Sequence, residues 1–166
     1  LGVPEKAAEL IEGTKAAVTD AAAANPNLAD YTFTYVYLGG EAGTLDSYPQ
    51  GDGRVDLLTN LGLVPAPSWA DYEPTEGSFT KTLGLENANQ LSDSDILVTW
   101  FNDEAEMATA TAQPLWQSIP AVQNDAVYAM MDESLGLATT VSTPLSVPWA
   151  LESYIPILNE TVAKAN

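Results

Sequence analysis

The segment GDGRVDLLTNLG, residues 51–62, contains the only arginine of this 166-residue chain, Arg54. A guanidinium group offers a planar fork of N–H donors that suits a pair of oxygen atoms. If a helix begins just before Arg54, the guanidinium lies in its first turn, where the helix macrodipole disfavours a positive charge. The nearby acids Asp52, Asp56 and Glu41 offer a surface ion pair, which would contribute under about 1 kcal/mol. What this single guanidinium binds is the first question that the sequence raises.

The composition excludes several kinds of site. The chain has no histidine and no cysteine, which rules out Ser-His-Asp and Cys-His catalysis and nearly every zinc or copper site. The glycine clusters LGG, GEAG and GDG lack the spacing of a dinucleotide-binding or Walker A loop. The acids Asp52, Asp56, Asp103, Glu104 and Glu106 are typical of solvated helix starts, not of general acids or calcium ligands. We therefore expect a non-catalytic protein with no metal site and no cofactor.

The charge of the chain limits its partners. With 23 acidic and five basic residues the formal net charge is −18, so we expect no nucleic-acid partner and no anionic membrane surface. A hydrophobic fraction of 46% nevertheless favours a folded domain over disorder. No apolar run is long enough to span a membrane, and no signal peptide is recognisable at the N-terminus. The length is typical of one domain.

Helical and strand patterns alternate along the chain. The apolar spacing and the turn residues predict helices over 4–24, 53–61 and 85–91, a helix after an Asn102 or Asp103 cap, and a closing helix over 144–163. Strands are expected over 31–38, 95–101 and 126–131, with loops over 39–52, 64–79 and 132–143. This alternation predicts an α/β layered domain with a mainly parallel sheet flanked by helices.

Ligands of open parallel sheets bind beyond the carboxyl ends of the strands. Applied here, the rule selects an aromatic, nearly uncharged rim as candidate ligand-binding residues: Tyr37, Tyr48, Arg54, Trp100, Phe101, Asn102 and Met131. Such a rim suits a bulky ligand held by stacking and a few polar contacts. The alternative is that Trp100 and Phe101 close the hydrophobic core. We expect Trp116 and Trp149 to be core residues.

Four segments in succession resemble a known family. They are GDGRVDLLTNLGLVPAP, LENANQLSDSDILVTWF, PLWQSIPAVQNDAVYAMM and STPLSVPWALESYIPIL. Together they look like the C-terminal lobe of the iron-siderophore substrate-binding proteins of ABC importers, of the ferric hydroxamate type. The resemblance covers nearly the whole chain in one order. It implies one lobe of a two-lobed periplasmic-binding-protein fold, in which two α/β lobes joined by a long helix grip a ferric chelate.

The resemblance also implies an organisation and partners. Residues 1–24 would be the end of the inter-lobe connecting helix, and residues 25–166 the C-terminal ligand-binding lobe. The N-terminal lobe, a signal peptide and a lipid-anchoring cysteine would precede this chain, in an extracytoplasmic, cell-surface lipoprotein. Its partners would be a ferric siderophore and an ABC permease. For the permease contact, Asp56 is the first candidate and Asp52 the second.

The scarcity of basic residues bears on the ligand. Family members that bind trianionic chelates tend to use several arginines, whereas this chain has one, which favours a near-neutral ferric hydroxamate. In such a site Arg54 would donate to a chelating oxygen. Three alternatives stay open: a cobalamin or haem receptor of the same architecture, a carboxylate-based α/β hydrolase, and a structural or adhesive domain.

Overall fold

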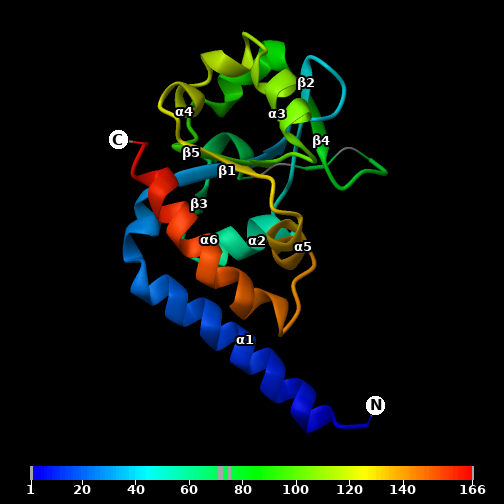
Figure 1. Cartoon of the computed structure of the whole chain (residues 1–166), viewed down its shortest axis with the longest axis vertical. Helices are drawn as coiled ribbons and strands as arrows, with labels where there is room; N and C mark the ends of the chain where they lie inside the picture. Colours follow the sequence, from blue (N-terminus) through cyan, green and yellow to red (C-terminus); the bar gives the residue numbers. More distant parts are fainter. Residues whose placement is uncertain (1, 71–72, 75, 166) are drawn as a thin grey trace.

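A mixed, mainly parallel sheet separates two layers of helices (Figure 1). The computed structural model describes residues 2–70, 73–74 and 76–165. The strand order is β4-β2-β1-β5-β6, with β3 paired to β1. Strand β1 pairs in parallel with β3 and with β5, and β5 pairs in parallel with β6. Strand β2 is antiparallel to both of its neighbours, β1 and β4. The strands are β1 Thr32–Tyr37, β2 Thr44–Ser47, β3 Val64–Pro65, β4 Lys81–Gly84, β5 Ile96–Trp100 and β6 Val127–Met130.

The α-helices are divided between the two faces of the sheet, with α1, α2, α5 and α6 on one side and α3 and α4 on the other (Figure 1). They are α1 Pro4–Ala24, α2 Gly53–Asn60, α3 Glu104–Thr111, α4 Pro120–Gln123, α5 Glu133–Thr140 and α6 Ser146–Val162. Four 3₁₀ segments complete the described elements: η1 Pro26–Asp30, η2 Pro67–Trp69, η3 Leu85–Leu91 and η4 Trp116–Ser118. The α/β layered fold predicted from the sequence is confirmed.

Strand β5 is buried on both faces, as its continuous apolar run ILV predicts. Ile96 and Val98 lie in the core cluster under α2, α5 and α6, whereas Leu97 lies in the opposite cluster with Trp116. Trp116 is 1% exposed, which confirms it as a packing residue. The expectation that Trp149 is a core residue is wrong, because its side chain, in the first part of α6, is 51% exposed.

All three segments expected to be loops contain some regular structure. Residues 64–79 include β3 and the 3₁₀ segment η2, and positions 71, 72 and 75 of this segment lie outside the described residues. Residues 39–52 include β2, whose sequence TLDS has one large apolar residue and is too short to show a strand period. Residues 132–143 include α5, which Asp132 caps by accepting a hydrogen bond from the Leu135 N–H at 3.0 Å. Gly136 and the threonines at its end weaken the helical signal in the sequence. In addition, 85–91 is 3₁₀ and not α-helical.

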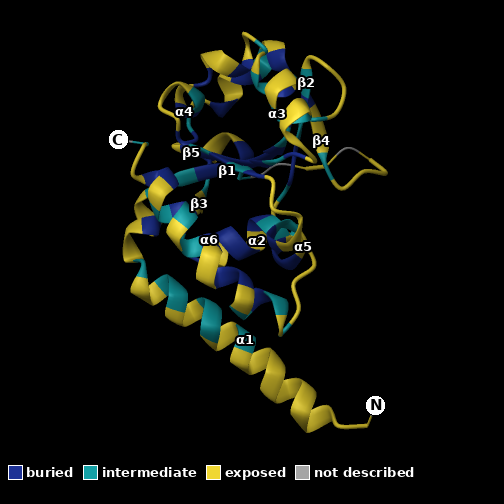
Figure 2. Cartoon of the chain, in the orientation of Figure 1, coloured by how far each residue is buried: buried dark blue, intermediate teal, exposed yellow. Residues whose placement is uncertain are grey.

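Helix α1 is attached to the rest of the chain along its second half only. Its partly buried residues Ala17, Val18 and Ala21 pack against the core cluster that includes α6. None of its residues is fully buried, and the first half projects away with all of its faces exposed (Figure 2). The division into 1–24 and 25–166 remains a prediction. Among the described residues, no helix combines the length and the apolar character needed to cross a membrane.

Candidate functional site

The carboxyl ends of β1, β5 and β6 lie side by side at one edge of the sheet. Tyr37 ends β1, Trp100 ends β5 and pairs with Met130 at the end of β6. Parallel pairing of neighbouring strands brings these three ends together even though they are far apart in sequence. The edge is therefore where the residues predicted to bind a ligand meet.

An aromatic platform, formed by Tyr37, Tyr48 and Trp100, covers this edge. The rings of Tyr37 and Trp100 are stacked, with centroids 4.2 Å apart and planes 10° apart. The indole Nε1–H of Trp100 donates to the Tyr48 hydroxyl oxygen at 3.2 Å. Tyr37 and Trp100 are partly exposed, whereas Tyr48 is 7% exposed. Three side chains from separate segments thus form one connected cluster of rings, of which Tyr37 and Trp100 are partly exposed.

Phe79 extends the platform and was not predicted from the sequence. Its ring is stacked on Tyr48 with centroids 6.4 Å apart and planes 24° apart, and its side chain is 68% exposed. Phe79 lies just before β4, and the antiparallel pairing of β4 with β2 brings it beside Tyr48. Since neither strand was predicted, no signal in the sequence connected Phe79 with the rim.

Arg54 lies beside the platform and is held by Asp52. Its Nε and Nη2 atoms donate to the two carboxylate oxygens of Asp52, each at 2.8 Å. The guanidinium carbon lies 3.7 Å from the centroid of the Tyr48 ring, within cation–π distance. The exposed fractions of the two side chains are 12% and 14%. The pair is therefore not the solvated surface ion pair that was one alternative for Arg54.

Asp52 also caps helix α2, because its carboxylate accepts the backbone N–H of Arg54 at 3.0 Å. Burial alone would raise the pKa of Asp52, but the hydrogen bonds and charge of Arg54 outweigh it and hold that pKa below its ordinary value. Burial would likewise lower the pKa of Arg54, yet its contact with Asp52 raises it. Arg54 stays charged, and its Nη1 atom donates to no described residue, which leaves N–H groups for a ligand.

A cavity of about 460 Å³ opens at this edge between the strand ends and α5; we call it the outlet cavity. Arg54, Trp100 and Met131 all line it, and Met131 is 41% exposed. Phe101 also borders the cavity but is 3% exposed and packs in the core cluster on the α3 and α4 side, in agreement with the core alternative for this residue. The exposed Asn102 lines the cavity as well, whereas Tyr37 and Tyr48, the other two residues of the predicted rim, are not among its described lining residues.

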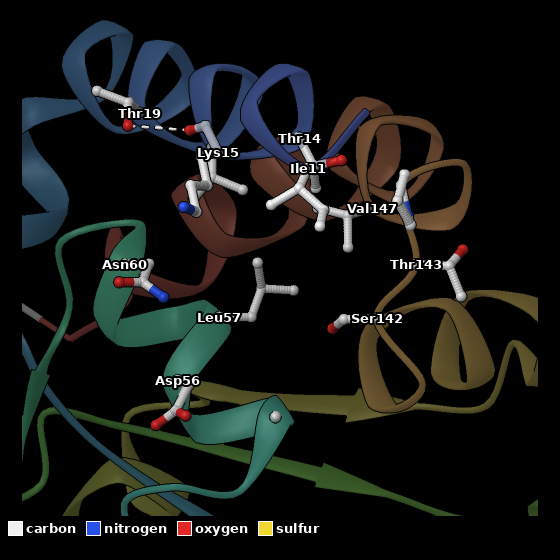
Figure 3. Close-up of a pocket in the computed structure, with 13 residues that line it drawn as sticks. Ile11, Thr14, Lys15, Thr19, Asp56, Leu57, Asn60, Ser142, Thr143 and Val147 are labelled. Atoms are coloured by element: carbon white, nitrogen blue, oxygen red, sulfur yellow. Dashed lines mark hydrogen bonds between the residues drawn. The ribbon is translucent and has the colours of Figure 1, made fainter. Parts of the chain in front are cut away.

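A second and larger cavity, of about 690 Å³, lies between α1, α2 and the connection from α5 to α6; we call it the α1 groove (Figure 3). Ile11 on α1 and Leu57 on α2 form opposite walls. Asp56 lines it too, is exposed, and accepts the Gly51 N–H at 2.9 Å. None of the described lining residues carries an aromatic ring. We regard the smaller outlet cavity as the candidate site, because rings and a cation converge there.

The site holds no evident place for a metal bound directly by the protein. Within the described ranges, no group of three or more histidine, cysteine, aspartate or glutamate residues is arranged to hold a metal ion. Two of the carboxylates at the outlet cavity are engaged in internal contacts, since Asp52 binds Arg54 and Asp132 caps α5. What the arrangement offers is stacking surface and N–H donors, which suit a preformed organic ligand.

Comparison with known proteins gives a consistent set of structural relatives. No protein-family model and no curated protein matches the sequence. Among solved structures, PiaA of Streptococcus pneumoniae in complex with ferrichrome matches 100% of this chain at 28% identity and a TM-score of 0.83. FhuD2 of Staphylococcus aureus with bound ferrioxamine B matches 97% of it at 12% identity and a TM-score of 0.71.

A third similar structure is the siderophore periplasmic binding protein from the fuscachelin gene cluster of Thermobifida fusca, with 21% identity over 96% of this chain and a TM-score of 0.71. The chain covers 56% of PiaA, 60% of FhuD2 and 55% of the Thermobifida protein. It therefore spans little more than half the length of the structures that it matches.

Proposed function

We propose that this chain, which has the fold of one lobe of the siderophore-binding substrate-binding proteins of ABC importers, is the ligand-binding half of an extracytoplasmic receptor for a ferric siderophore. In this proposal a second lobe precedes α1, the two lobes close on the chelate, and the receptor delivers it to a permease without altering it chemically. The observation that carries the proposal is the convergence of the aromatic platform and Arg54 at the edge of the sheet.

The chemistry of the outlet cavity supports a ferric hydroxamate as the ligand. Arg54 is already neutralised by Asp52, and Asp132 and Glu133 also line the cavity, so this half of the site carries no excess positive charge. A trianionic chelate would be repelled by such a surface, whereas a neutral or cationic one would not. The free Nη1 hydrogens of Arg54 suit a chelating oxygen, and the platform suits the apolar backbone of the chelate.

For the permease we propose Asp56 as the contact residue. Asp52, the second candidate, has its carboxylate occupied by Arg54 and is largely buried. Asp56 lies one helical turn later, is exposed, and uses one oxygen for a backbone N–H. An arginine of a membrane partner can therefore approach Asp56 without breaking an internal ion pair. Anchoring by a lipid attached to a preceding segment is part of the same proposal.

The proposed function is tested by titrating tryptophan fluorescence of the two-lobed protein with ferrioxamine B, ferrichrome, iron-free desferrioxamine B and ferric citrate. We expect the two ferric hydroxamates to quench the fluorescence at low concentration, and the iron-free ligand and citrate not to. Replacement of Trp100 by Phe should remove most of the quenching, whereas Trp149→Phe is the matched control because the Trp149 side chain is half exposed on α6 and does not line the outlet cavity. Failure of every ferric hydroxamate to bind would refute the proposal, and quenching by cobalamin or haem alone would transfer it to that ligand class.

A further inference from the structure

We infer that Glu106 is a positioning residue of the ligand site, whose carboxylate ties Tyr37 to Asn102 and so holds the Tyr37 ring flat against Trp100. The inference rests on the proposed function, because the stacked pair is the surface on which the chelate would lie. Glu106 belongs to α3, on the far side of the sheet from α2 and α5, and looks from the sequence like an ordinary acid in a first helical turn.

Both carboxylate oxygens of Glu106 are used, and they reach two different strand ends. Oε1 accepts the Tyr37 hydroxyl at 2.7 Å, at the end of β1. Oε2 accepts the backbone N–H of Asn102 at 2.5 Å and its side-chain amide at 2.9 Å, just after β5. Glu106 therefore bridges the two strands that carry the stacked rings of Tyr37 and Trp100.

The neighbouring residue Asp103 fixes the backbone of Glu106 in a position that favours this bridge. Asp103 caps α3 by accepting the Glu106 N–H at 2.8 Å, which fixes the backbone from which the side chain projects. A glutamate three residues after a cap commonly reaches back to a backbone N–H, for which one oxygen suffices. Here the second oxygen crosses to β1, and helix capping alone gives no reason for that contact.

Gly39 supplies an independent observation. A Cβ atom at this position would lie 1.9 Å from Oε1 of Glu106 and 2.7 Å from the Tyr37 hydroxyl oxygen. Any side chain at Gly39 would therefore displace the carboxylate or the tyrosine. The absence of a side chain at Gly39 therefore leaves room for the contact between Tyr37 and Glu106.

The Glu106 bridge determines which hydrogen-bonding groups of the platform remain available to a ligand. Because a carboxylate only accepts, the Tyr37 hydroxyl donates to Glu106 and has only lone pairs left for a ligand. Burial and the Glu106 contacts raise the pKa of Tyr37 to about 12, so the hydroxyl keeps its proton near neutral pH. Arg54 offers only donors. A chelate on the platform would thus direct oxygen atoms toward Arg54 and N–H groups toward Tyr37.

The test compares Glu106→Ala, Glu106→Gln and Tyr37→Phe with Glu104→Gln, the matched control, which removes an exposed charge from the same helical turn. Two quantities are measured in the two-lobed protein: affinity for ferrioxamine B, and the ligand-free near-ultraviolet circular dichroism of the stacked rings. We expect Glu106→Ala to lower affinity about tenfold and to change the dichroism. Glu106→Gln, whose single carbonyl oxygen can accept from Tyr37 or from Asn102 but not from both, should restore part of both quantities, and Glu104→Gln should match wild type.

The double variant Tyr37→Phe/Glu106→Ala separates positioning from a general effect on the fold. If Glu106 acts through Tyr37, the double variant loses no more affinity than the more affected single variant. Additive losses, or wild-type affinity and dichroism in Glu106→Ala, would overturn the inference. If Glu106→Ala does not fold, Glu106→Gln and Tyr37→Phe carry the comparison, and equal dichroism in all of the folded proteins overturns it. If wild type binds no chelate but the dichroism changes as expected, the proposed function fails and the positioning role of Glu106 stands.

Discussion

The outlet cavity and the α1 groove differ more in the residues that line them than in their volumes. The α1 groove is the larger, at about 690 Å³ against about 460 Å³, yet no aromatic ring is found among the described residues of its walls, which come from helices and from the connection between α5 and α6. The outlet cavity is bounded by Trp100 and Arg54, each fixed by contacts to other side chains. Convergent, immobilised groups are therefore a better guide to a binding site than volume.

The elements behind the two cavities explain this difference. Three neighbouring parallel strands end at the outlet cavity, and the hydrogen bonds of the sheet fix their relative positions. The α1 groove depends on α1, which has no fully buried residue and is held mainly through small partly buried ones such as Ala17 and Ala21. A site that must hold a ligand in one geometry benefits from the rigid edge of the sheet.

The largest expected effect is that of Trp100→Ala. The change removes the stacking partner of Tyr37 and the hydrogen-bond donor to Tyr48. We therefore expect the binding free energy for ferric hydroxamates to weaken by about 1 to 3 kcal/mol, measured by calorimetry on the two-lobed protein. Trp149→Ala is the control. Equal losses in the two variants would remove the distinction between the outlet cavity and the rest of the surface.

Arg54→Ala is expected to act on both stability and binding. It leaves the largely buried Asp52 carboxylate without its partner, so the free energy of unfolding should fall by about 1 to 3 kcal/mol in denaturant titrations. Arg54→Lys should fall between wild type and alanine in both quantities, because it keeps the charge and loses the two-pronged contact. A fully stable alanine variant with unchanged affinity would contradict the role given to this pair.

Two acids at the start of α2 allow the two cavities to be compared. Asp52 caps the helix and binds Arg54 of the outlet cavity, whereas Asp56 lines the α1 groove. Since the folded-state pKa of Asp52 is lowered, its ionised form stabilises the fold above the unfolded-state pKa, and this contribution is lost as the pH falls through the folded-state value. The difference in unfolding free energy between wild type and Asp52→Asn should therefore be constant above about pH 5 and shrink as the pH falls below about 4, the ordinary pKa of an aspartate. Asp56→Asn is the control that removes a charge from the same helix without touching Arg54. A difference for Asp52→Asn that is constant with pH would be the contrary result.

A smaller effect is expected for Phe79→Ala. The ring is mostly exposed and contacts the platform only through Tyr48, so we expect about a two- to tenfold loss of chelate affinity and little change in stability. Fluorescence titration against ferrioxamine B measures it. An effect as large as that of Trp100→Ala would mean that the platform centres on Tyr48 and Phe79, not on Tyr37 and Trp100.

The smallest effect belongs to the α1 groove. Ile11 is 49% exposed, so Ile11→Ser should change the free energy of unfolding by less than about 0.5 kcal/mol and leave chelate affinity at its wild-type value. Thermal unfolding and the same fluorescence titration give both numbers. A marked loss of affinity would show that the ligand uses the α1 groove.

The sequence predicted the edge of the sheet correctly because the apolar runs of β1, β5 and β6 are strong local signals and parallel strands place their ends together. It failed where placement depends on distant pairing. Phe79 reaches Tyr48 through the pairing of β4 with β2, and Glu106 reaches Tyr37 across 69 positions of sequence. A short strand and an ordinary helix-start acid carry no local mark of such contacts.

Arg54 is a residue whose role the sequence predicted only in part. Its neighbourhood of acids was evident, but the choice among Asp52, Asp56 and Glu41 depended on the turn before α2, in which Asp52 both caps the helix and faces the guanidinium. The stacking of Arg54 on Tyr48 needed the position of β2 as well. The sequence could thus identify the residue, and only the fold could identify its partners.

The most direct test is anomalous diffraction at the iron absorption edge from crystals of the two-lobed protein grown with ferrioxamine B. Our account predicts a single iron position above the rings of Tyr37 and Trp100, with a chelating oxygen in hydrogen-bond contact with Arg54. Iron located in the α1 groove, or on a surface away from the carboxyl ends of β1 and β5, would contradict it.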